Sequence, residues 1–227
     1  MTPFDKDVTV HVTDSALMHL LLAGMESYRA KRHGALETGG LLWGFIKDET
    51  DSEMDHITIE HVSTDTYAKR KPDSVALSDR TTSAKRDVIE QRWPHLSMIG
   101  DFHTHPYTNY TEAVDNKGWE FSRGDFEWYE NGHTAESWAG RVGLVLAIAG
   151  LQRYHKDNHA TTRVRSRYGN TLQWQLGRYR FWLSAYSVDP LEGRLIVSPR
   201  GGANPSRRYV YIDVPTINGT DAWFTYE

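Results

Sequence analysis

The chain has 227 residues with 39% hydrophobic side chains, 25% charged side chains and a formal net charge of -4. This composition is ordinary for a folded domain and lacks the basic character of a dedicated nucleic-acid binder, so we expect no nucleic-acid partner. Because there is no cysteine, disulfides and thiolate metal sites are excluded, and His, Asp or Glu must hold any metal. No apolar run approaches the roughly 20 residues that span a bilayer, and no signal peptide is visible. We therefore expect a cytoplasmic protein without a membrane partner.

The first quarter of the chain predicts a strand, a helix and a hairpin. Valines alternate with polar residues over 8–12, which is the pattern of a strand. Asp14 is the expected N-cap of a helix over 17–32, in which apolar residues recur at helical spacing. Apolar runs at 41–46 and 57–62 flank an acidic turn and predict the two strands of a hairpin.

A second helix is expected after a polar loop. Residues 64–77 are irregular and polar, and the segment 78–93 follows with a serine at its start and a proline after its end. Ala84, Val88 and Ile89 are the residues of this helix that we expect to face the core.

The middle of the chain carries a compact motif between predicted strands. The apolar run 96–102 predicts a buried strand that leads directly into His103-Thr104-His105-Pro106. Residues 107–120 are polar and predict a loop, and Ser122 is a suitable N-cap for a short helix. The apolar run 142–148 predicts another buried strand.

The last third predicts only strands. Alternating patterns over 172–176 and 179–185 indicate an antiparallel pair, and 195–197 and 209–214 indicate further strands. No linker of domain-boundary character is visible. We therefore expect one α/β (α+β) domain with a mixed central sheet flanked by helices, formed by a core over 1–150 and a β-rich extension over 151–227.

His103, His105 and Asp125 form a candidate metal site. One residue separates the two histidines, so on a strand both imidazoles lie on the same face. Asp125 lies one turn into the helix after Ser122, which puts both on the same side of that helix. Two histidines and one carboxylate leave a fourth tetrahedral position open for water, which is the catalytic arrangement of zinc. A hydrolase also needs a general base, and Glu37, which precedes two glycines and a buried strand, is the candidate.

The order of these residues resembles the JAMM motif of MPN-type (JAB) zinc metalloproteases. The matching residues are Glu37, His103, His105, Ser122 and Asp125. The contexts ETGGLLWG and IGDFHTHP are also similar to that family, and the match covers about residues 8–150. The resemblance implies a cytidine-deaminase-like fold with the helices around a mixed sheet.

The resemblance also implies a role for each matching residue. His103, His105 and Asp125 would bind Zn²⁺, and Thr104 would help to shape the ligand strand. Glu37 would take a proton from the zinc-bound water and give it to the leaving amine, and Ser122 would donate a hydrogen bond to the oxyanion.

One segment departs from the family pattern. The gap between His105 and Ser122 is longer than usual, which indicates an insertion within Tyr107–Phe121. This segment either gates the site or is a rigid surface insertion. Trp119 and Phe121 in it are candidates for substrate contact, with local packing as the alternative.

The expected activity is hydrolysis of an amide or isopeptide bond. The resemblance implies a ubiquitin or ubiquitin-like protein, or its conjugate, as substrate, with an extended tail paired to a sheet edge, and conjugation enzymes as possible partners. Two alternatives stay open: a non-catalytic MPN-type scaffold, and a JAMM hydrolase that acts on a small-molecule or carrier-protein conjugate or in DNA processing. Intact ligands disfavour the scaffold. His155 and His159 have helical spacing, but the residues between them favour a turn over a second metal site.

Overall fold

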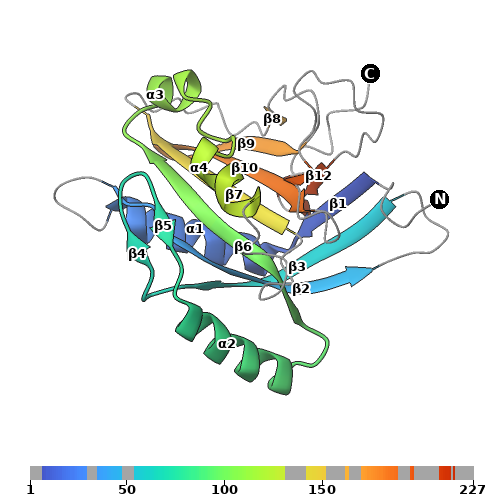
Figure 1. Cartoon of the computed structure of the whole chain (residues 1–227). Coiled ribbons are helices and arrows are strands. Elements are labelled where there is room, and N and C mark those ends of the chain that lie inside the picture. The colour runs from blue at the N-terminus through green and yellow to red at the C-terminus, as the bar shows by residue number, and fades with distance from the viewer. Residues whose placement is uncertain are drawn as a thin grey trace.

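A mixed sheet of ten strands, with helices on both of its faces, organises the protein in the computed structural model (Figure 1). The expected mixed α/β domain is confirmed at this level. Among the described residues, no helix is both long and apolar enough to cross a bilayer. The residues that the structure describes are 7–29, 35–47, 54–130, 142–151, 162–163, 170–188, 195–196, 210–215 and 217.

The first part of the chain folds as the alternating pattern predicts. Its elements are β1 (Asp7–Val12), α1 (Asp14–Arg29), β2 (Gly39–Lys47) and β3 (Met54–Thr64). Successive residues of β1 alternate between half-buried and buried, and its three valines are the buried ones. The cap of α1 was predicted one residue too late: the hydroxyl of Thr13 accepts a hydrogen bond from the Ala16 N–H at 3.3 Å, and Asp14 is already inside the helix. Threonine is also an accepted capping residue.

The predicted loop over 64–77 contains a small hairpin. Its strands are β4 (Lys69–Arg70) and β5 (Val75–Ala76). Asp65 is buried at its base and accepts hydrogen bonds from the Tyr67 and Ser78 N–H groups and from the Thr81 hydroxyl. The hairpin is therefore fixed to the start of the next helix by one carboxylate.

That helix, α2 (Asp79–Arg92), has the expected bounds, but of the three residues expected to face the core only Ile89 packs against it. Val88 is 62% exposed and Ala84 is also exposed, whereas Thr82 is buried and Ile89 is partly buried. Lys85, one turn after Thr82, also turns to the sheet and donates to the Thr64 carbonyl of β3 at 2.7 Å.

The strand that carries the two histidines is longer than expected. It is β6 (Ser97–Tyr107), and Pro106 lies within it, paired with Ile148 of β7 (Val142–Gly150). The predicted loop after it contains a helix, α3 (Tyr110–Asp115), and then comes α4 (Arg123–Glu130). Asn109 caps α3 by accepting from the Glu112 N–H at 3.0 Å.

The last third contributes strands to both ends of the sheet. The strands are β8 (Thr162–Arg163), β9 (Thr171–Leu176), β10 (Tyr179–Val188), β11 (Leu195–Ile196) and β12 (Val210–Asp213). The expected antiparallel pairing of β9 and β10 is confirmed. The strand order is β12-β1-β3-β2-β6-β7-β10-β9-β8, and β11 pairs with β10. β12 pairs in parallel with β1, and β10 lies antiparallel to β7, so the C-terminal third is part of the same sheet.

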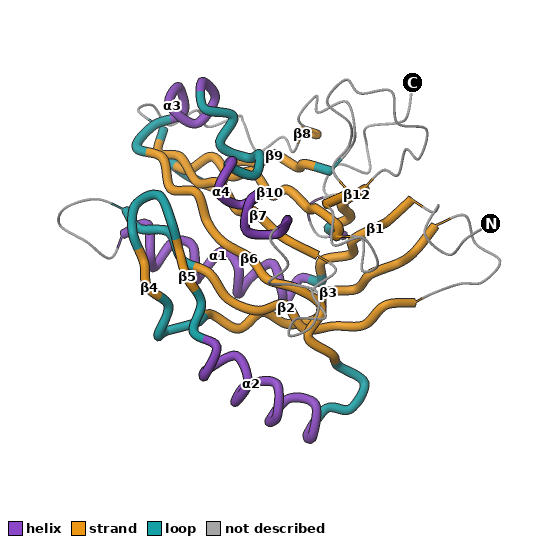
Figure 2. Tube along the Cα trace, in the orientation of Figure 1, coloured by secondary structure: helices purple, strands orange, loops and turns teal. Residues whose placement is uncertain are grey.

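Different helices pack on the two faces of the sheet (Figure 2). α1 packs on the large apolar core, which takes in the valines of β1 and apolar residues of β3, β6, β7, β9, β10 and β12. α2 packs over Leu41, Trp43 and Met98 on the opposite face, and α3 packs over Ala147 and Trp182. In the second half of β6, Phe102 lies in the core under α1, and the Thr104 side chain lies against Gly24 of α1. Because side chains alternate along a strand, His103 and His105 point to the face of α2 and α3.

Candidate metal centre

The two histidines of β6 are buried and converge. His103 is 8% exposed and His105 is 7% exposed. Their Nε2 atoms lie 3.0 Å apart, and the rings are tilted by 59° with centroids 4.8 Å apart. Tilted rings with nearly touching nitrogen atoms direct both lone pairs to one point, as two ligands of a single metal ion require.

The carboxylate of Asp125 completes the group from α4. Its Oδ1 lies 3.3 Å from Nε2 of His103, and its Oδ2 lies 3.6 Å from Nε2 of His105. The ligand atoms of these three residues all lie within 4.8 Å of one another. The structure therefore brings together the three predicted metal ligands from two separate elements.

The start of α4 holds Asp125 by a reciprocal cap. The Ser122 N–H donates to Oδ2 of Asp125 at 2.6 Å, and the Asp125 N–H donates to the Ser122 hydroxyl oxygen at 3.2 Å. The predicted capping role of Ser122 is confirmed. Because the serine oxygen is the acceptor in this bond, its own proton can be donated to another group.

One backbone carbonyl orients His105. Its Nδ1 donates to the Gly118 carbonyl at 2.8 Å, so in the neutral ring Nε2 carries the lone pair. Position 118 also has no room for a side chain, because a Cβ there would lie 2.1 Å from the ring of Tyr107. The donor set fits zinc, because two imidazoles and one carboxylate leave room for a fourth ligand.

Glu37 lies beside the centre in a fixed loop before β2. It is 7% exposed, and its N–H donates to the Lys71 carbonyl of the β4–β5 hairpin at 2.9 Å. The next residue, Thr38, exchanges two hydrogen bonds of 2.9 Å with Thr104: the Thr38 N–H donates to the Thr104 hydroxyl, and the Thr104 N–H donates to the Thr38 carbonyl. Thr104 lies between the two histidines, so these bonds connect the loop of Glu37 to the ligand strand.

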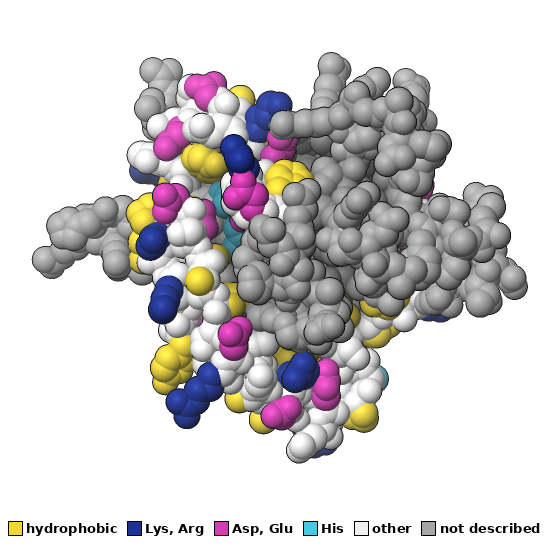
Figure 3. All heavy atoms as spheres, viewed as in Figure 1, with side chains coloured by type: hydrophobic (Ala, Val, Ile, Leu, Met, Phe, Trp, Pro, Cys, Tyr) yellow, Lys and Arg dark blue, Asp and Glu magenta, His cyan; other side chains and the backbone are white. Residues whose placement is uncertain are grey.

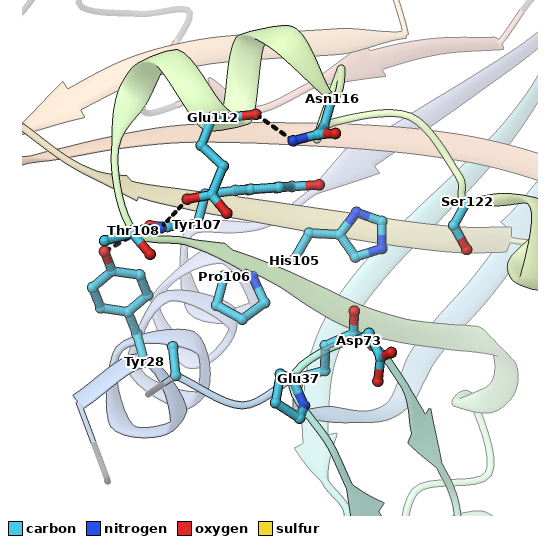
Figure 4. A pocket seen from close by; sticks show the side chains of 12 residues that line it. Tyr28, Glu37, Asp73, His105, Pro106, Tyr107, Thr108, Glu112, Asn116 and Ser122 are labelled. Atoms are coloured by element: carbon cyan, nitrogen blue, oxygen red, sulfur yellow. Dashed lines mark hydrogen bonds between the residues drawn. The ribbon is translucent and has the colours of Figure 1, made fainter. Parts of the chain in front are cut away.

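Glu37 and His105 open on a cleft of about 680 Å³. Figure 4 shows Glu37 and Asp73 on one side of β6, and Glu112 of α3 on the other side, with Ser122 at the far end. Histidine atoms are visible at the bottom of a hollow with acidic side chains near it in the space-filling view (Figure 3). Tyr28, Pro72, Pro106 and Tyr107 add apolar surface to the cleft. The cleft is therefore lined by three residues of the motif, Glu37, His105 and Ser122.

Burial and charge set the protonation of the site. Burial raises the pKa of Glu37 from 4.5 to about 8, and while His103 lowers it, Asp125 and Asp73 raise it further. Burial alone would lower the pKa of His103, but the attraction and hydrogen bond of Asp125 outweigh it, so this pKa is raised. Burial would raise the pKa of Asp125, but His103 and His105 hold it well below its usual range.

No profile of a known protein family matches the chain. A search of curated proteins also finds no match.

Trp119 and Phe121 pack against the sheet in the structure. Phe121 is buried, and its ring stacks on Tyr186 of β10 with centroids 3.8 Å apart. Trp119 is half-buried and stacks on Trp182. Neither residue lines the cleft described above. Their burial favours the packing alternative over substrate contact. The sequence did not reveal their partners, Tyr186 and Trp182 of β10.

The segment between the ligands is also packed. Ala113 of α3 is fully buried against β7 and β10. The signal for α3 was present in the sequence, because Asn109 and Glu112 have the spacing of a capping box; in the structure Glu112 accepts from the N–H of Thr108, one residue before the cap, at 2.9 Å. These contacts support a rigid insertion rather than a gate. His155 and His159 lie outside the described residues.

The raised pKa of Glu37 predicts a pH effect on the metal-free protein. Between pH 4.5 and 8 the folded state binds the proton that the unfolded state has lost, so the free energy of unfolding falls as pH rises through this window. At about 1.4 kcal/mol per pKa unit, the loss is at most about 5 kcal/mol. The raised pKa of His103 acts in the same direction above pH 6.5. Urea unfolding with a chelator at pH 5 and pH 8 measures the loss, and Glu37→Gln should reduce it. An equal loss of unfolding free energy in the wild-type chain and in Glu37→Gln would contradict the raised pKa of Glu37.

Proposed function

We propose that this protein is a zinc-dependent hydrolase that cleaves an amide bond with a water molecule. The observation that carries the proposal is the convergence of His103, His105 and Asp125 within 4.8 Å beside a buried glutamate whose pKa is raised. Held by these three residues, a zinc ion would supply a Lewis acid that acidifies the attacking water. Perturbed pKa values in a cleft are typical of catalytic acids and bases.

Glu37 is the proton carrier in this proposal. Its carboxylate accepts a proton from the attacking water and returns it to the nitrogen of the leaving amine. Burial makes Glu37 a stronger base than an exposed glutamate, and the positive charge of a nearby metal would keep it ionised at neutral pH. The bond from its N–H to Lys71 and the link through Thr38 hold it in place beside the ligand strand.

Ser122 is the donor to the oxyanion that develops on the substrate carbonyl. Its hydroxyl oxygen already accepts from Asp125, and its proton can point to the cleft that it lines. One such donor contributes about 10²–10³-fold to kcat. Ser122→Ala should therefore lower kcat by this factor with little change in KM.

The same substitution removes a helix cap, so its effect on folding needs a matched control. Loss of a cap costs about 1 kcal/mol of stability. Thr13→Ala removes the cap of α1, far from the cleft, and should lower the melting temperature similarly without changing kcat. A Ser122→Ala protein with unchanged kcat and a raised KM would mean that Ser122 binds the substrate rather than the transition state.

The substrate that we propose is the tail of a ubiquitin-like protein joined by an amide or isopeptide bond. The support is the resemblance of the motif to the JAMM family, with the charge of the cleft as an additional guide. Glu37, Asp73 and Glu112 line the cleft, and among the described residues that line it none is Lys or Arg. When Glu37 and Asp125 offset the two charges of zinc, Asp73 and Glu112 remain and favour a basic tail.

A pair of substrates tests this proposal. A ubiquitin-like protein with a fluorogenic C-terminal amide is compared with a version in which basic tail residues are replaced by glutamate. The zinc-loaded protein should cleave the basic version with a higher kcat/KM, and a chelator should abolish cleavage. Asp73→Asn should reduce the preference, because Asp73 contributes part of the negative charge. Cleavage of a small-molecule amide but of neither tail would favour the alternative hydrolase, and no cleavage of any amide would contradict the proposal.

A further inference from the structure

Tyr186 of β10 holds the segment between the metal ligands with one hydroxyl group. It is 4% exposed and lies on the same face of the sheet as the two histidines. Its hydroxyl accepts a hydrogen bond from the Phe121 N–H at 3.0 Å and donates one to the Trp119 carbonyl at 3.3 Å. The hydroxyl therefore satisfies a donor and an acceptor on both sides of Glu120.

The ring of Tyr186 reaches His103 through one aromatic residue. Tyr186 and Phe121 stack with centroids 3.8 Å apart and an interplanar angle of 16°. Phe121 in turn stacks on His103 with centroids 5.7 Å apart. Offset or stacked aromatic pairs restrict the tilt of both rings, so Phe121 fixes the plane of the His103 imidazole.

The residue that precedes the segment 119–121, which Tyr186 holds, orients His105. Gly118, whose carbonyl accepts from Nδ1 of His105, immediately precedes Trp119. Ser122, which caps the helix of Asp125, immediately follows Phe121. Within residues 118–122, Gly118 bonds to His105, Phe121 stacks on His103 and Ser122 bonds to Asp125. The Tyr186 hydroxyl is hydrogen-bonded to the middle of this segment.

We infer that Tyr186 is a positioning residue of the metal centre, acting through residues 118–122 on His103, His105 and Asp125. This inference rests on the metal site of the proposed function. Tyr186 does not line the cleft and is not one of the three residues whose ligand atoms converge. Its effect on the metal is indirect, like that of other groups that hydrogen-bond to or orient ligands.

The alternative is that Tyr186 only stabilises the fold, as any buried and bonded tyrosine does. Thr171→Val is the matched control for this alternative. The Thr171 hydroxyl is buried and bonds to the Ser184 hydroxyl at 2.8 Å and to Asn170 at 3.3 Å, and among the described residues none of its hydrogen bonds reaches residues 118–122. Both substitutions remove one buried hydroxyl near β10 and keep most of the side-chain volume.

Tyr186→Phe tests the inference because it removes the hydroxyl and keeps the stacked ring. Zinc affinity is measured by competition with a chromogenic chelator, and the absorption bands of the Co²⁺-loaded protein report the ligand geometry. Loss of a group that orients ligands typically weakens metal binding about 10–100-fold. We expect weakening in this range and altered Co²⁺ bands for Tyr186→Phe, but wild-type affinity and bands for Thr171→Val, with similar drops in melting temperature.

The outcomes separate this inference from the proposed function. If the wild-type chain binds zinc and Tyr186→Phe binds it equally with unchanged Co²⁺ bands, the inference is wrong while the metal site stands. Equal weakening by Thr171→Val would also overturn it, because the effect would then come from stability alone. If the wild-type chain binds neither metal, the proposed function fails and the inference fails with it. A hydrolase assay is not needed for any of these results.

Discussion

Glu37→Gln should leave zinc binding intact and reduce turnover by about 10²–10⁴-fold, the usual contribution of a general acid–base group. Glutamine has the shape of glutamate, and the Glu37 N–H bond to Lys71 does not involve the side chain, so the loop should keep its position. The amide cannot take a proton from water, so the chemical step fails. Metal analysis together with kcat at saturating substrate measures both parts of the prediction.

The role of Glu37 as a base and not a ligand can be contradicted directly. The ligand atoms that converge belong to His103, His105 and Asp125, and Glu37 is not among them. If Glu37→Gln loses zinc, the carboxylate belongs to the metal ligands. Asp73→Asn is the control, because it removes a neighbouring carboxylate of the same cleft and should affect kcat far less.

His103→Ala combined with His105→Ala should abolish zinc binding, where the wild-type chain should carry about one zinc ion per chain. The carboxylate of Asp125 would be left as a single ligand, and one monodentate carboxylate does not retain Zn²⁺ against a chelator. Metal content after dialysis against a chelator measures the loss. His95→Ala is the matched control, because the His95 side chain is 61% exposed and lies outside the converging group. Equal zinc in the double variant and in the wild-type chain would place the metal elsewhere.

The ligand strand and its helix were predictable because their signals are local. Each signal lies in a short stretch of chain: an apolar run that leads into a His-x-His pair, and a serine three residues before an aspartate. The first stretch forms a strand and the second forms the start of a helix, as their patterns predict. The convergence of these stretches was not derivable from periodicity. It was expected only because the order of the residues resembles a known motif.

The parts that could not be predicted depend on distant contacts. Lys85 on the inner side of α2 is satisfied by a carbonyl of β3, which no helical pattern reveals. Tyr186 lies 65 positions after Phe121, whose N–H bonds to it, and an alternating strand pattern shows only that Tyr186 is on one of two faces. Asn109 and Glu112 are a different case, because their capping box was readable and was overlooked in a polar stretch.

The pairing of β12 with β1 has a consequence for how the protein is made. β1 lies between β3, which follows it closely in sequence, and β12, which is synthesised about 200 residues later. While the ribosome is still producing the last third of the chain, β1 lacks one neighbour, and β7 at the other end lacks β10. A nascent chain of the first 150 residues therefore carries two open sheet edges, and its three metal ligands still lack the bonds that Tyr186 makes to residues 118–122. Open edges invite pairing with other chains, so we expect the growing chain to be most prone to aggregation before β10 and β12 have been made.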